Sequence, residues 1–271
     1  MSADTASRLP AGASPWPAQR WSGDWLPPGS EALAEEAAVA LVFNGIAHTV
    51  MMATPTDLED FALGFTLTEG LLERPADLYG VEVVPTDAGI ELQLEVSSAC
   101  ERRLKERRRT LAGRSGCGLC GAESLAQVRR SLPPVVPLHV HAKAVAHAEA
   151  ELAARQRLQQ ATGATHAAAW VNLQGQLLEL REDIGRHNAL DKLVGALVRR
   201  EVAVTEGFVL VTSRASFEMV QKAVVLGTGL LAAVSAPTSL AVACAREANL
   251  CVLGFVRPGK LTAYTFAERL L

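Results

Sequence analysis

The stretch that decides the fold is FVLVTSRASFEMVQKAVVLGTGLLAAVSAPTSLAVACAREANLCVLGFVR, residues 208–257. Three short apolar runs, FVLV, LLAA and CVLGFV, are separated by two segments with the apolar period of a helix. Strands that alternate with helices are typical of parallel pairing through right-handed crossovers. The stretch therefore predicts an α/β domain, in which ligands bind at the carboxyl ends of the strands.

The same alternation extends toward the N-terminus. Residues 141–160 (HAKAVAHAEAELAARQRLQQ) are alanine-rich and lack Gly and Pro, which predicts one helix. THAAAWVN and QLLELRED follow as two short strands, and residues 187–200 form a second helix. We therefore assign residues 136–271 to one α/β domain with a mixed, largely parallel sheet.

Residues 37–135 have a different pattern, that of a smaller β-rich α+β domain. Residues 37–54 predict a hairpin around Asn44-Gly45, and a helix begins after Thr56 or Asp57. The runs VEVV and IELQLEV alternate like an antiparallel pair. The domain ends in a basic segment, a CxxC loop and a proline-rich linker, LPPVVPLHV. Residues 1–36 are rich in Pro, Gly, Ser and Ala, which predicts an extended or disordered arm.

Composition narrows the class of protein. The 271 residues are 49% hydrophobic, enough for one large or two modest domains. The net charge of −3 argues against a general nucleic-acid binder. No apolar run approaches the roughly 20 residues of a membrane span, and no signal peptide is visible. Five scattered cysteines do not resemble a secreted disulfide framework, so we expect a cytoplasmic protein.

Polar clusters follow the predicted strands of the C-terminal domain, in REDIGRHNALDK, TSRASFEMVQK and SAPTSLAV. Each cluster opens a helix, whose free N–H groups and dipole suit a phosphate or another anion. Helix capping explains any one cluster equally well, but three at one sheet edge favour a binding crevice. The last strand ends in GFVRPGK, where an aromatic ring could stack on a base. The candidate side chains are Arg186, His187, Ser213, Arg214, Lys222, Ser235, Thr238, Ser239, Phe255, Arg257 and Lys260.

The motif CGLC, Cys117 to Cys120, has four interpretations. A structural zinc site needs four ligands, and a second pair is missing apart from the poorly spaced His139 and His141. A thioredoxin-like dithiol normally follows a strand in a βαβ unit, which is not the pattern here. The flanking glycines argue against inert core cysteines. A nucleophilic thiolate that accepts and passes on a group is favoured, because seven basic residues in 101–114 would lower a thiol pKa.

The strings SGCGLCGAESL, TGATHAA, EDIGRHNALDKLVGA, VTSRASFEMVQKA, SAPTSLAV and GFVR occur in an order that resembles the FdhD/NarQ family, over about residues 38–266. That family consists of formate dehydrogenase accessory sulfurtransferases. The resemblance implies a cytoplasmic homodimer that takes sulfur from a cysteine desulfurase. It passes that sulfur to the molybdenum cofactor in its bis-guanine-dinucleotide form, which GDP or GTP mimics, and formate dehydrogenase is the client.

By motif position, Cys117 resembles the persulfide-carrying cysteine of the family and Cys120 its companion. The resemblance implies no resident metal. The family's cofactor-binding stretch is matched here by Phe255, Val256, Arg257, Pro258, Gly259 and Lys260.

The order of predicted elements in residues 136–271 is also similar to the cytidine deaminase fold. Zinc deaminases open one helix with His-x-Glu and the next with Pro-Cys-x-x-Cys. The corresponding helices here begin His187-Asn188-Ala189 and ASFEM, so the general acid/base and two zinc ligands are absent. The deaminase fold is therefore expected without its chemistry, as a site for a nucleotide-like ligand. A non-catalytic chaperone that binds the molybdenum cofactor is the alternative to a sulfurtransferase.

Overall fold

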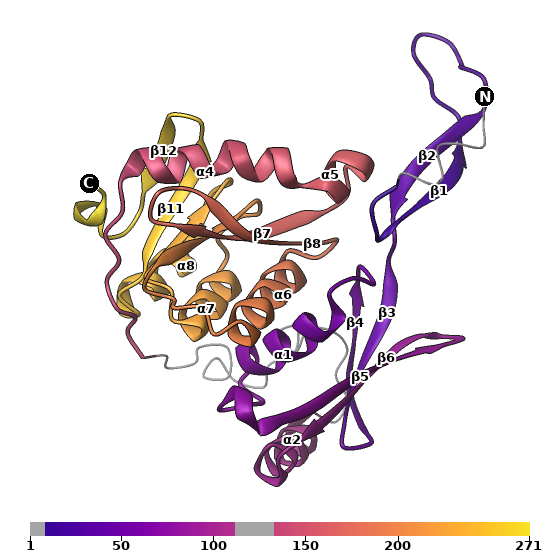
Figure 1. The fold of residues 1–271 in the computed structure, drawn as a ribbon, viewed down its shortest axis with the longest axis horizontal. Helices are drawn as coiled ribbons and strands as arrows, with labels where there is room; N and C mark the ends of the chain where they lie inside the picture. Colours follow the sequence, from indigo (N-terminus) through magenta and orange to yellow (C-terminus); the bar gives the residue numbers. More distant parts are fainter. Residues whose placement is uncertain (1–8, 112–132) are drawn as a thin grey trace.

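Six strands form the sheet of the C-terminal part, in the order β12-β11-β10-β9-β7-β8. The computed structural model describes residues 9–111 and 133–271 (Figure 1). The strands are β7 (His166–Asn172), β8 (Leu177–Asp183), β9 (Gly207–Val211), β10 (Leu230–Ala233), β11 (Cys251–Arg257) and β12 (Lys260–Ala263).

The sheet is mixed, as the sequence predicts, but its parallel part is smaller than expected. β9, β10 and β11 pair in parallel, whereas β7 is antiparallel to both β8 and β9. β12 was not predicted and pairs antiparallel with β11. The turn before β12 contains Gly259 at φ 73°, which reverses the chain directly after β11 and adds this edge strand.

Helices cover both faces of this sheet (Figure 1). α4 (Ala142–Arg155) lies on one face, and α6 (Arg186–Arg199), α7 (Phe217–Leu226) and α8 (Ser239–Glu247) pack on the other. Every residue of β9 is buried, with Val209 and Val211 in one core cluster and Phe208 and Leu210 in the other. Burial on two faces explains why the strand sequences are continuously apolar.

The helix predicted over 141–160 is two helices. α4 ends at Arg155, and α5 (Arg157–Thr162) begins after a break at Gln156 with φ −74° and ψ 78°. Glu182 accepts hydrogen bonds from the backbone N–H groups of Leu158 and Gln159, at 2.9 and 2.8 Å. A carboxylate from β8 thus caps the new helix, and no local pattern in the helix sequence reveals that distant partner.

The N-terminal part contains a four-stranded sheet in the order β4-β3-β6-β5. The predicted hairpin around Asn44-Gly45 is confirmed, with both residues at positive φ. Asp57 precedes the first helix but its side chain makes no capping hydrogen bond. The elements are β3 (Ala37–Phe43), β4 (Ile46–Ala53), α1 (Leu58–Thr68), β5 (Leu78–Thr86), β6 (Gly89–Val96) and α2 (Ser98–Leu111), with short 3-10 helices at Pro75–Asp77 and Ala267–Arg269.

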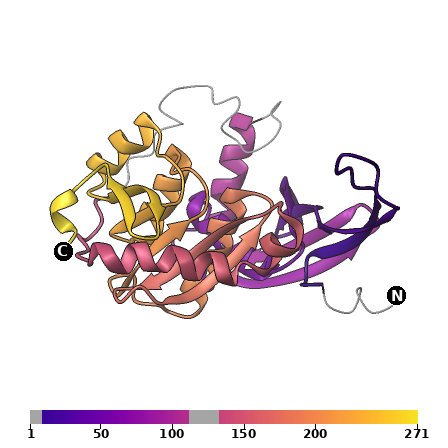
Figure 2. The ribbon, with the colours of Figure 1, turned by 90° about the horizontal axis from the view of Figure 1, so that it is seen from above.

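The region before this sheet forms a ribbon, where the sequence predicts an extended or disordered arm. β1 (Ala13–Ala18) and β2 (Gly29–Ala34) pair antiparallel and contact α5. Figure 2 shows the ribbon and the N-terminal sheet at one end of the molecule and β11 and β12 at the other. Backbone pairing orders this proline-rich stretch although its three tryptophans, Trp16, Trp21 and Trp25, remain exposed.

The segment LPPVVPLHV, predicted as a linker, packs on the C-terminal sheet in its described part. Val135, Leu138 and Val140 are buried, and the Val135 N–H donates to the carbonyl of Ala248. The apolar side chains between the prolines therefore belong to the core although the backbone is irregular. Within the described ranges no helix is long and apolar enough to cross a membrane.

Helix α1 joins the two parts, because it packs on the N-terminal sheet and against α6 (Figure 1). The two helices approach closely at Gly64 and Gly195. A Cβ atom on Gly64 would lie 1.7 Å from the Asp191 carbonyl oxygen, and one on Gly195 would lie 1.9 Å from that of Asp60. The absence of side chains at both positions thus permits backbone contact between the two parts.

Candidate functional site

The topology brings the predicted polar clusters to one edge of the C-terminal sheet. Because β7 is antiparallel to β8 and β9, the carboxyl ends of β8, β9, β10 and β11 lie together with the first residue of β7. Backbone hydrogen bonds link the loops, from Val234 N–H to Val211 and from Phe255 N–H to Ser235. Thr238 N–H likewise donates to Ala215. The three helix-opening segments and the end of β11 therefore form one surface.

The turn between β8 and α6 is held by Asp183, whose side chain is fully buried. Its Oδ1 accepts from Gly185 N–H at 2.7 Å and from Asn188 Nδ2 at 3.0 Å. Its Oδ2 accepts from Thr54 N–H at 3.0 Å and lies 2.7 Å from Lys192 Nζ. Much of the DIGRHNALDK motif is thus occupied in fixing its own backbone.

Thr54, directly after β4, supplies the other half of this arrangement. Lys192 Nζ donates to the Thr54 carbonyl at 2.9 Å, and Ile184 N–H donates to Thr54 Oγ1 at 3.2 Å. The N-terminal part therefore fixes the turn from which Arg186 and His187 project at the edge.

Arg186 and His187 begin α6 and keep unused donors. Arg186 Nε and His187 Nε2 are buried atoms without a well-formed hydrogen bond in the described part of the chain. His187 Nε2 lies 3.4 Å from Glu218 Oε2, and Ser216 Oγ donates to the same oxygen at 2.9 Å. Interaction with His187, and secondarily the Ser216 bond, lowers the pKa of Glu218 to about 2, although burial opposes this. A carboxylate therefore faces His187 at any physiological pH.

A second histidine, His166, begins β7 beside this pair. Its Nδ1 lies 3.5 Å from Thr212 Oγ1. Burial, and after it the electrostatic interaction with the neighbouring Arg186 and His187, lowers the pKa of His166. The neutral imidazole therefore predominates near pH 7, with one ring nitrogen that donates and one that accepts.

Lys222, which the sequence predicts as a positive charge of the site, lies inside the protein. Its Nζ donates to both carboxylate oxygens of Asp191, at 2.9 and 3.0 Å, and to Thr68 and Glu69 at 2.9 and 3.1 Å. Burial alone would lower the pKa of this ammonium, but the carboxylates of Asp191 and Glu69 more than offset it, so the pKa is raised. Lys222 therefore joins α7 to α1 and α6 and is not a free cation for a phosphate.

The remaining predicted side chains of the loops differ in exposure. Arg214 is exposed at the edge, whereas Ser213 is buried and donates to the Arg214 carbonyl at 3.0 Å. Thr238 caps α8 by accepting from the Ala241 N–H, so the capping interpretation holds for this residue. Ser235 is partly exposed beside it. Arg214 is thus the exposed cation of these two loops.

The end of β11 presents an aromatic ring in an unusual backbone conformation. Phe255 is 48% exposed and has φ 51°, the left-handed region that bulky residues rarely adopt. Val256 points the other way and is fully buried in the core, so its side chain is out of reach of a ligand. Arg257 Nη1 donates to the carbonyls of Val234 and Val256. Pro258, Gly259 and Lys260 are exposed in the turn.

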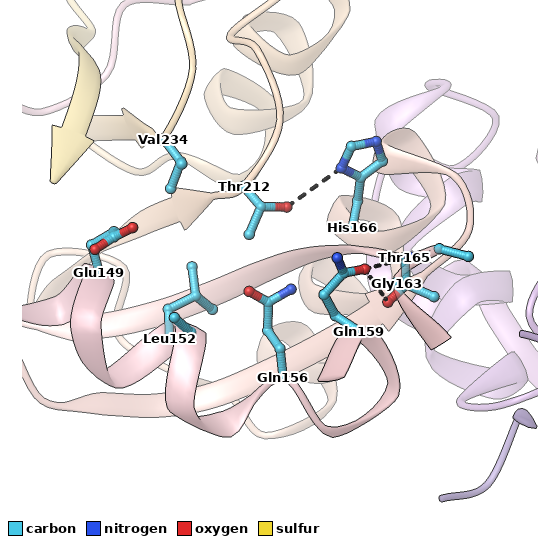
Figure 3. A pocket seen from close by; sticks show the side chains of 11 residues that line it. Glu149, Leu152, Gln156, Gln159, Gly163, Thr165, His166, Thr212 and Val234 are labelled. Carbon is cyan, nitrogen blue, oxygen red and sulfur yellow. Dashed lines mark hydrogen bonds between the residues drawn. The ribbon is translucent and has the colours of Figure 1, made fainter. Parts of the chain in front are cut away.

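A cavity of about 490 Å³ lies between α4, α5 and the same sheet edge (Figure 3). Polar side chains of Glu149, Gln156, Gln159, His166 and Thr212 line it together with apolar ones such as Leu152 and Val234. The helical residues of this group were not predicted from the sequence. The one sequence signal for them is the i, i+3, i+4, i+7 spacing of Glu149, Leu152, Ala153 and Gln156, which places them on one helix face. In the structure this face lines the cavity, next to the break in the helix at Gln156.

The family model of the FdhD/NarQ family matches residues 34–271, which include both parts and the whole edge. The chain belongs to the FdhD/NarQ family. The match excludes most of the β1–β2 ribbon, so the ribbon lies before the region that defines the family.

Curated relatives of this FdhD/NarQ protein are similar over nearly their whole length. The "Sulfur carrier protein FdhD" of Variovorax paradoxus is 59% identical over 248 residues, covering 91% of this chain and 87% of the relative. The protein of the same name from Bordetella petrii is 55% identical over 246 residues, covering 89% and 87%. That of Cupriavidus necator is 53% identical over 252 residues, covering 93% and 88%.

A solved structure supports the fold of this family member. The crystal structure of a proposed formate dehydrogenase accessory protein from Desulfotalea psychrophila matches with a TM-score of 0.75 and 21% identity, over 96% of this chain and 99% of that one. The expected two-part α/β architecture is thereby confirmed.

The two cysteines of the CxxC motif, Cys117 and Cys120, lie outside the described residues of this FdhD/NarQ chain. The other three cysteines are structural. Cys100 and Cys251 are fully buried and Cys244 packs against the core. Burial raises the pKa of the Cys251 thiol to about 11, so it stays protonated and unreactive.

Proposed function

We propose that this protein is a sulfur carrier for the maturation of formate dehydrogenase. Cys117 accepts sulfur as a persulfide from a cysteine desulfurase and transfers it to the molybdenum cofactor in its bis-guanine-dinucleotide form. Family membership and the printed names of the curated relatives support the carrier role. One observation supports binding of the sulfur-accepting cofactor by this chain. The N-termini of α6, α7 and α8 lie at one sheet edge together with Arg186, Arg214 and Phe255.

The edge has the donors that a dinucleotide cofactor requires as substrate. The N-terminal N–H groups of α6, α7 and α8 suit pyrophosphate, and Arg214 and Lys260 are exposed cations beside them. The exposed ring of Phe255 offers a face on which a heterocycle can stack. The bound cofactor supplies the metal that receives the sulfur, whereas the chain binds and orients it.

The first chemical step is an exchange between thiols. The Cys117 thiolate attacks the terminal sulfur of the donor persulfide, the donor S–S bond breaks, a new S–S bond forms on Cys117, and the desulfurase cysteine leaves as a thiolate. Cys120 then relays this sulfur, by attacking the outer sulfur so that Cys117 leaves as a thiolate, or resolves the persulfide, by attacking the Cys117 sulfur so that a Cys117–Cys120 disulfide forms and the outer sulfur leaves as sulfide for the acceptor. We further propose a cytoplasmic homodimer with one nucleotide site per subunit, for which GDP or GTP serves as a mimic.

Mass spectrometry after incubation with a cysteine desulfurase and cysteine tests the carrier role. We expect a mass gain of one sulfur atom on the CxxC peptide, its loss in Cys117→Ala, and its retention in the matched control Cys244→Ala. Unchanged sulfur loading in Cys117→Ala contradicts the assignment. No loading of the wild type, with normal cofactor binding, instead identifies a chaperone that binds the cofactor without carrying sulfur.

Titration calorimetry with GDP tests whether the sheet edge binds the nucleotide part of the cofactor. Cys117→Ala should bind GDP as the wild type does, because the edge is built from other residues. Arg214→Ala should weaken GDP binding without altering sulfur loading, since it removes an exposed cation. An unchanged affinity removes Arg214 from the site.

A further inference from the structure

The β1–β2 ribbon carries three exposed tryptophans on an ordered backbone. Trp16, Trp21 and Trp25 are 57%, 65% and 64% exposed. The closed end of the ribbon is fixed internally, because Trp21 and Trp25 form a β-bridge and the Trp25 N–H donates to Asp24 Oδ1 at 2.7 Å. Indole rings are enriched at the energetic centres of protein interfaces, and a fixed backbone lowers the entropy lost on binding. The ribbon therefore has the composition of a docking element.

The root of the ribbon keeps it from folding back on its own chain. Only Glu35 and Glu36 separate β2 from β3, and the Glu35 N–H donates to the Gly12 carbonyl at 2.7 Å. A Cβ atom on Gly12 would lie 2.6 Å from Thr54 Cγ2, so the root also packs tightly on the segment after β4. Figure 1 shows the ribbon pointing away from the four-stranded sheet. The tryptophans are therefore presented to another molecule.

The four-stranded sheet has an apolar surface of its own on β4. Ala53 faces the core, so strand alternation directs Val50 and Met52 to the opposite face, where they are 57% and 49% exposed. Ala38 and Ala40 of β3 pair with Met52 and Val50. We call this group of four residues the β4 face. Methionine is flexible and its sulfur makes favourable contacts with aromatic rings, so the β4 face suits an indole.

The charge of the ribbon favours a protein over a membrane as its partner. Arg20 is the one cation among residues 9–36, and it is paired with Glu31. Glu35 and Glu36 add negative charge at the root. Anionic headgroups attract clusters of Lys and Arg, which this ribbon lacks. An apolar protein surface such as the β4 face is therefore the better match.

We propose that the ribbon of one copy of this chain docks its tryptophans on the β4 face of a second copy, reciprocally about a twofold axis. Three indoles that are each more than half exposed offer on the order of 400 Å². Because a twofold axis uses two ribbons and two β4 faces, the contact buries roughly 1,600 Å², the size of a stable protein interface. The proposal gives the surface through which the homodimer proposed above associates, and it depends on no step of the sulfur transfer.

Sedimentation velocity over a range of protein concentrations tests the contact. Combining Trp16→Ala, Trp21→Ala and Trp25→Ala should raise the dissociation constant of the dimer at least about 10-fold and leave the far-UV circular dichroism unchanged, because the rings are exposed. The control combines Leu178→Ala and Leu240→Ala, whose side chains are 51% and 41% exposed elsewhere, and should dimerise as the wild type does. A wild type that is monomeric throughout, or a triple variant that associates normally, overturns the proposal.

Cross-linking between two differently tagged variants identifies the docking surface. In a background with Cys117→Ala and Cys120→Ala, a Trp21→Cys chain mixed with a Met52→Cys chain should be joined by a short bis-maleimide. A mixture of Trp21→Cys with Leu240→Cys should not be joined, because Leu240 lies on α8 and outside the β4 face. Equal cross-linking in both mixtures contradicts docking on the β4 face.

Substitution of the β4 face tests the second half of the contact. Met52→Glu should weaken association and Met52→Leu should retain it, because only the first places a charge in the apolar contact. Equal association of both variants contradicts the contact.

Flotation with vesicles of phosphatidylcholine and phosphatidylglycerol tests the other kind of partner. Ribbon-dependent binding to the vesicles, with self-association unchanged in the triple tryptophan variant, identifies a lipid surface and overturns the proposal. Sulfur loading is read in parallel. A wild type that dimerises through the ribbon but takes up no sulfur contradicts the carrier role alone, whereas normal loading of a monomeric wild type overturns the contact alone.

Discussion

Gly64 of α1 and Gly195 of α6 face each other where the two helices cross, so that a Cβ atom on Gly64 would lie 2.9 Å from the backbone nitrogen of Gly195. This contact joins the N-terminal sheet to the domain that carries the candidate site. It occurs directly beside Asp191, whose carboxylate pairs with Lys222 of α7 and accepts a hydrogen bond from Thr68 Oγ1 of α1 across the same joint. The relative position of the two parts thus depends on backbone contact as much as on side chains.

Gly64→Ala should destabilise the protein by about 3 kcal/mol or more, because the added methyl overlaps a helix backbone that has no room to yield. Urea unfolding measures this loss. Gly29→Ala is the matched control, since a Cβ there meets nothing within 4 Å. A Gly64→Ala variant as stable as the control contradicts the close approach.

Lys192→Met should cost about 3–5 kcal/mol, because it leaves the fully buried Asp183 carboxylate without its cation. Lys105→Met is the control, as Lys105 forms an exposed pair with Glu101 whose loss should leave the stability nearly unchanged. Both are measured by urea unfolding at pH 7. Adding Asp183→Asn to Lys192→Met should recover part of the loss, and the absence of any recovery argues against an uncompensated charge as the cause.

Glu218→Gln should reduce stability in a pH-dependent way. The pKa of Glu218 is lowered to about 2 in the folded protein, so its stabilisation is present above its ordinary pKa and is lost as pH falls toward 2. Because the side chain is partly exposed, we expect a difference from wild type of about 1 kcal/mol at pH 7. That difference should close between about pH 5 and pH 2. Urea unfolding at pH 7, 5 and 3 measures it, and a difference independent of pH contradicts the His187–Glu218 interaction.

Substitutions of Phe255 should affect ligand binding and protein stability independently. Phe255→Gly relieves the left-handed backbone, so it should be about 1 kcal/mol more stable than Phe255→Ala, which keeps the strain. Both variants should bind GDP more weakly than wild type because they lack the exposed ring. Thermal unfolding and calorimetry measure the two effects. Phe255→Tyr, which retains the ring, should bind normally, and a similar loss in this variant argues against stacking.

The buried central strands of the C-terminal sheet were predictable because their apolar runs are local and burial on both faces leaves a continuous signal, as in β9, whereas the edge strand β12 lacks that signal. The clusters at their ends could be placed at one edge from the alternation of strands and helices alone. The break at Gln156 could not, because Glu182 of β8 caps the second helix from outside the helical sequence.

The sequence by itself determined the order of strands and helices, the family resemblance and the edge at which a ligand would bind, since periodicity and motif strings are properties of adjacent residues. Only the tertiary structure decided which charged residues of those motifs are free. Lys222 and Lys192 have the same sequence character as Arg214, yet the first two are buried against carboxylates and the third is exposed. The reason is physical: a charge is buried only where folding supplies a partner, and Asp191 and Asp183 become those partners when α7 and β8 pack against α6.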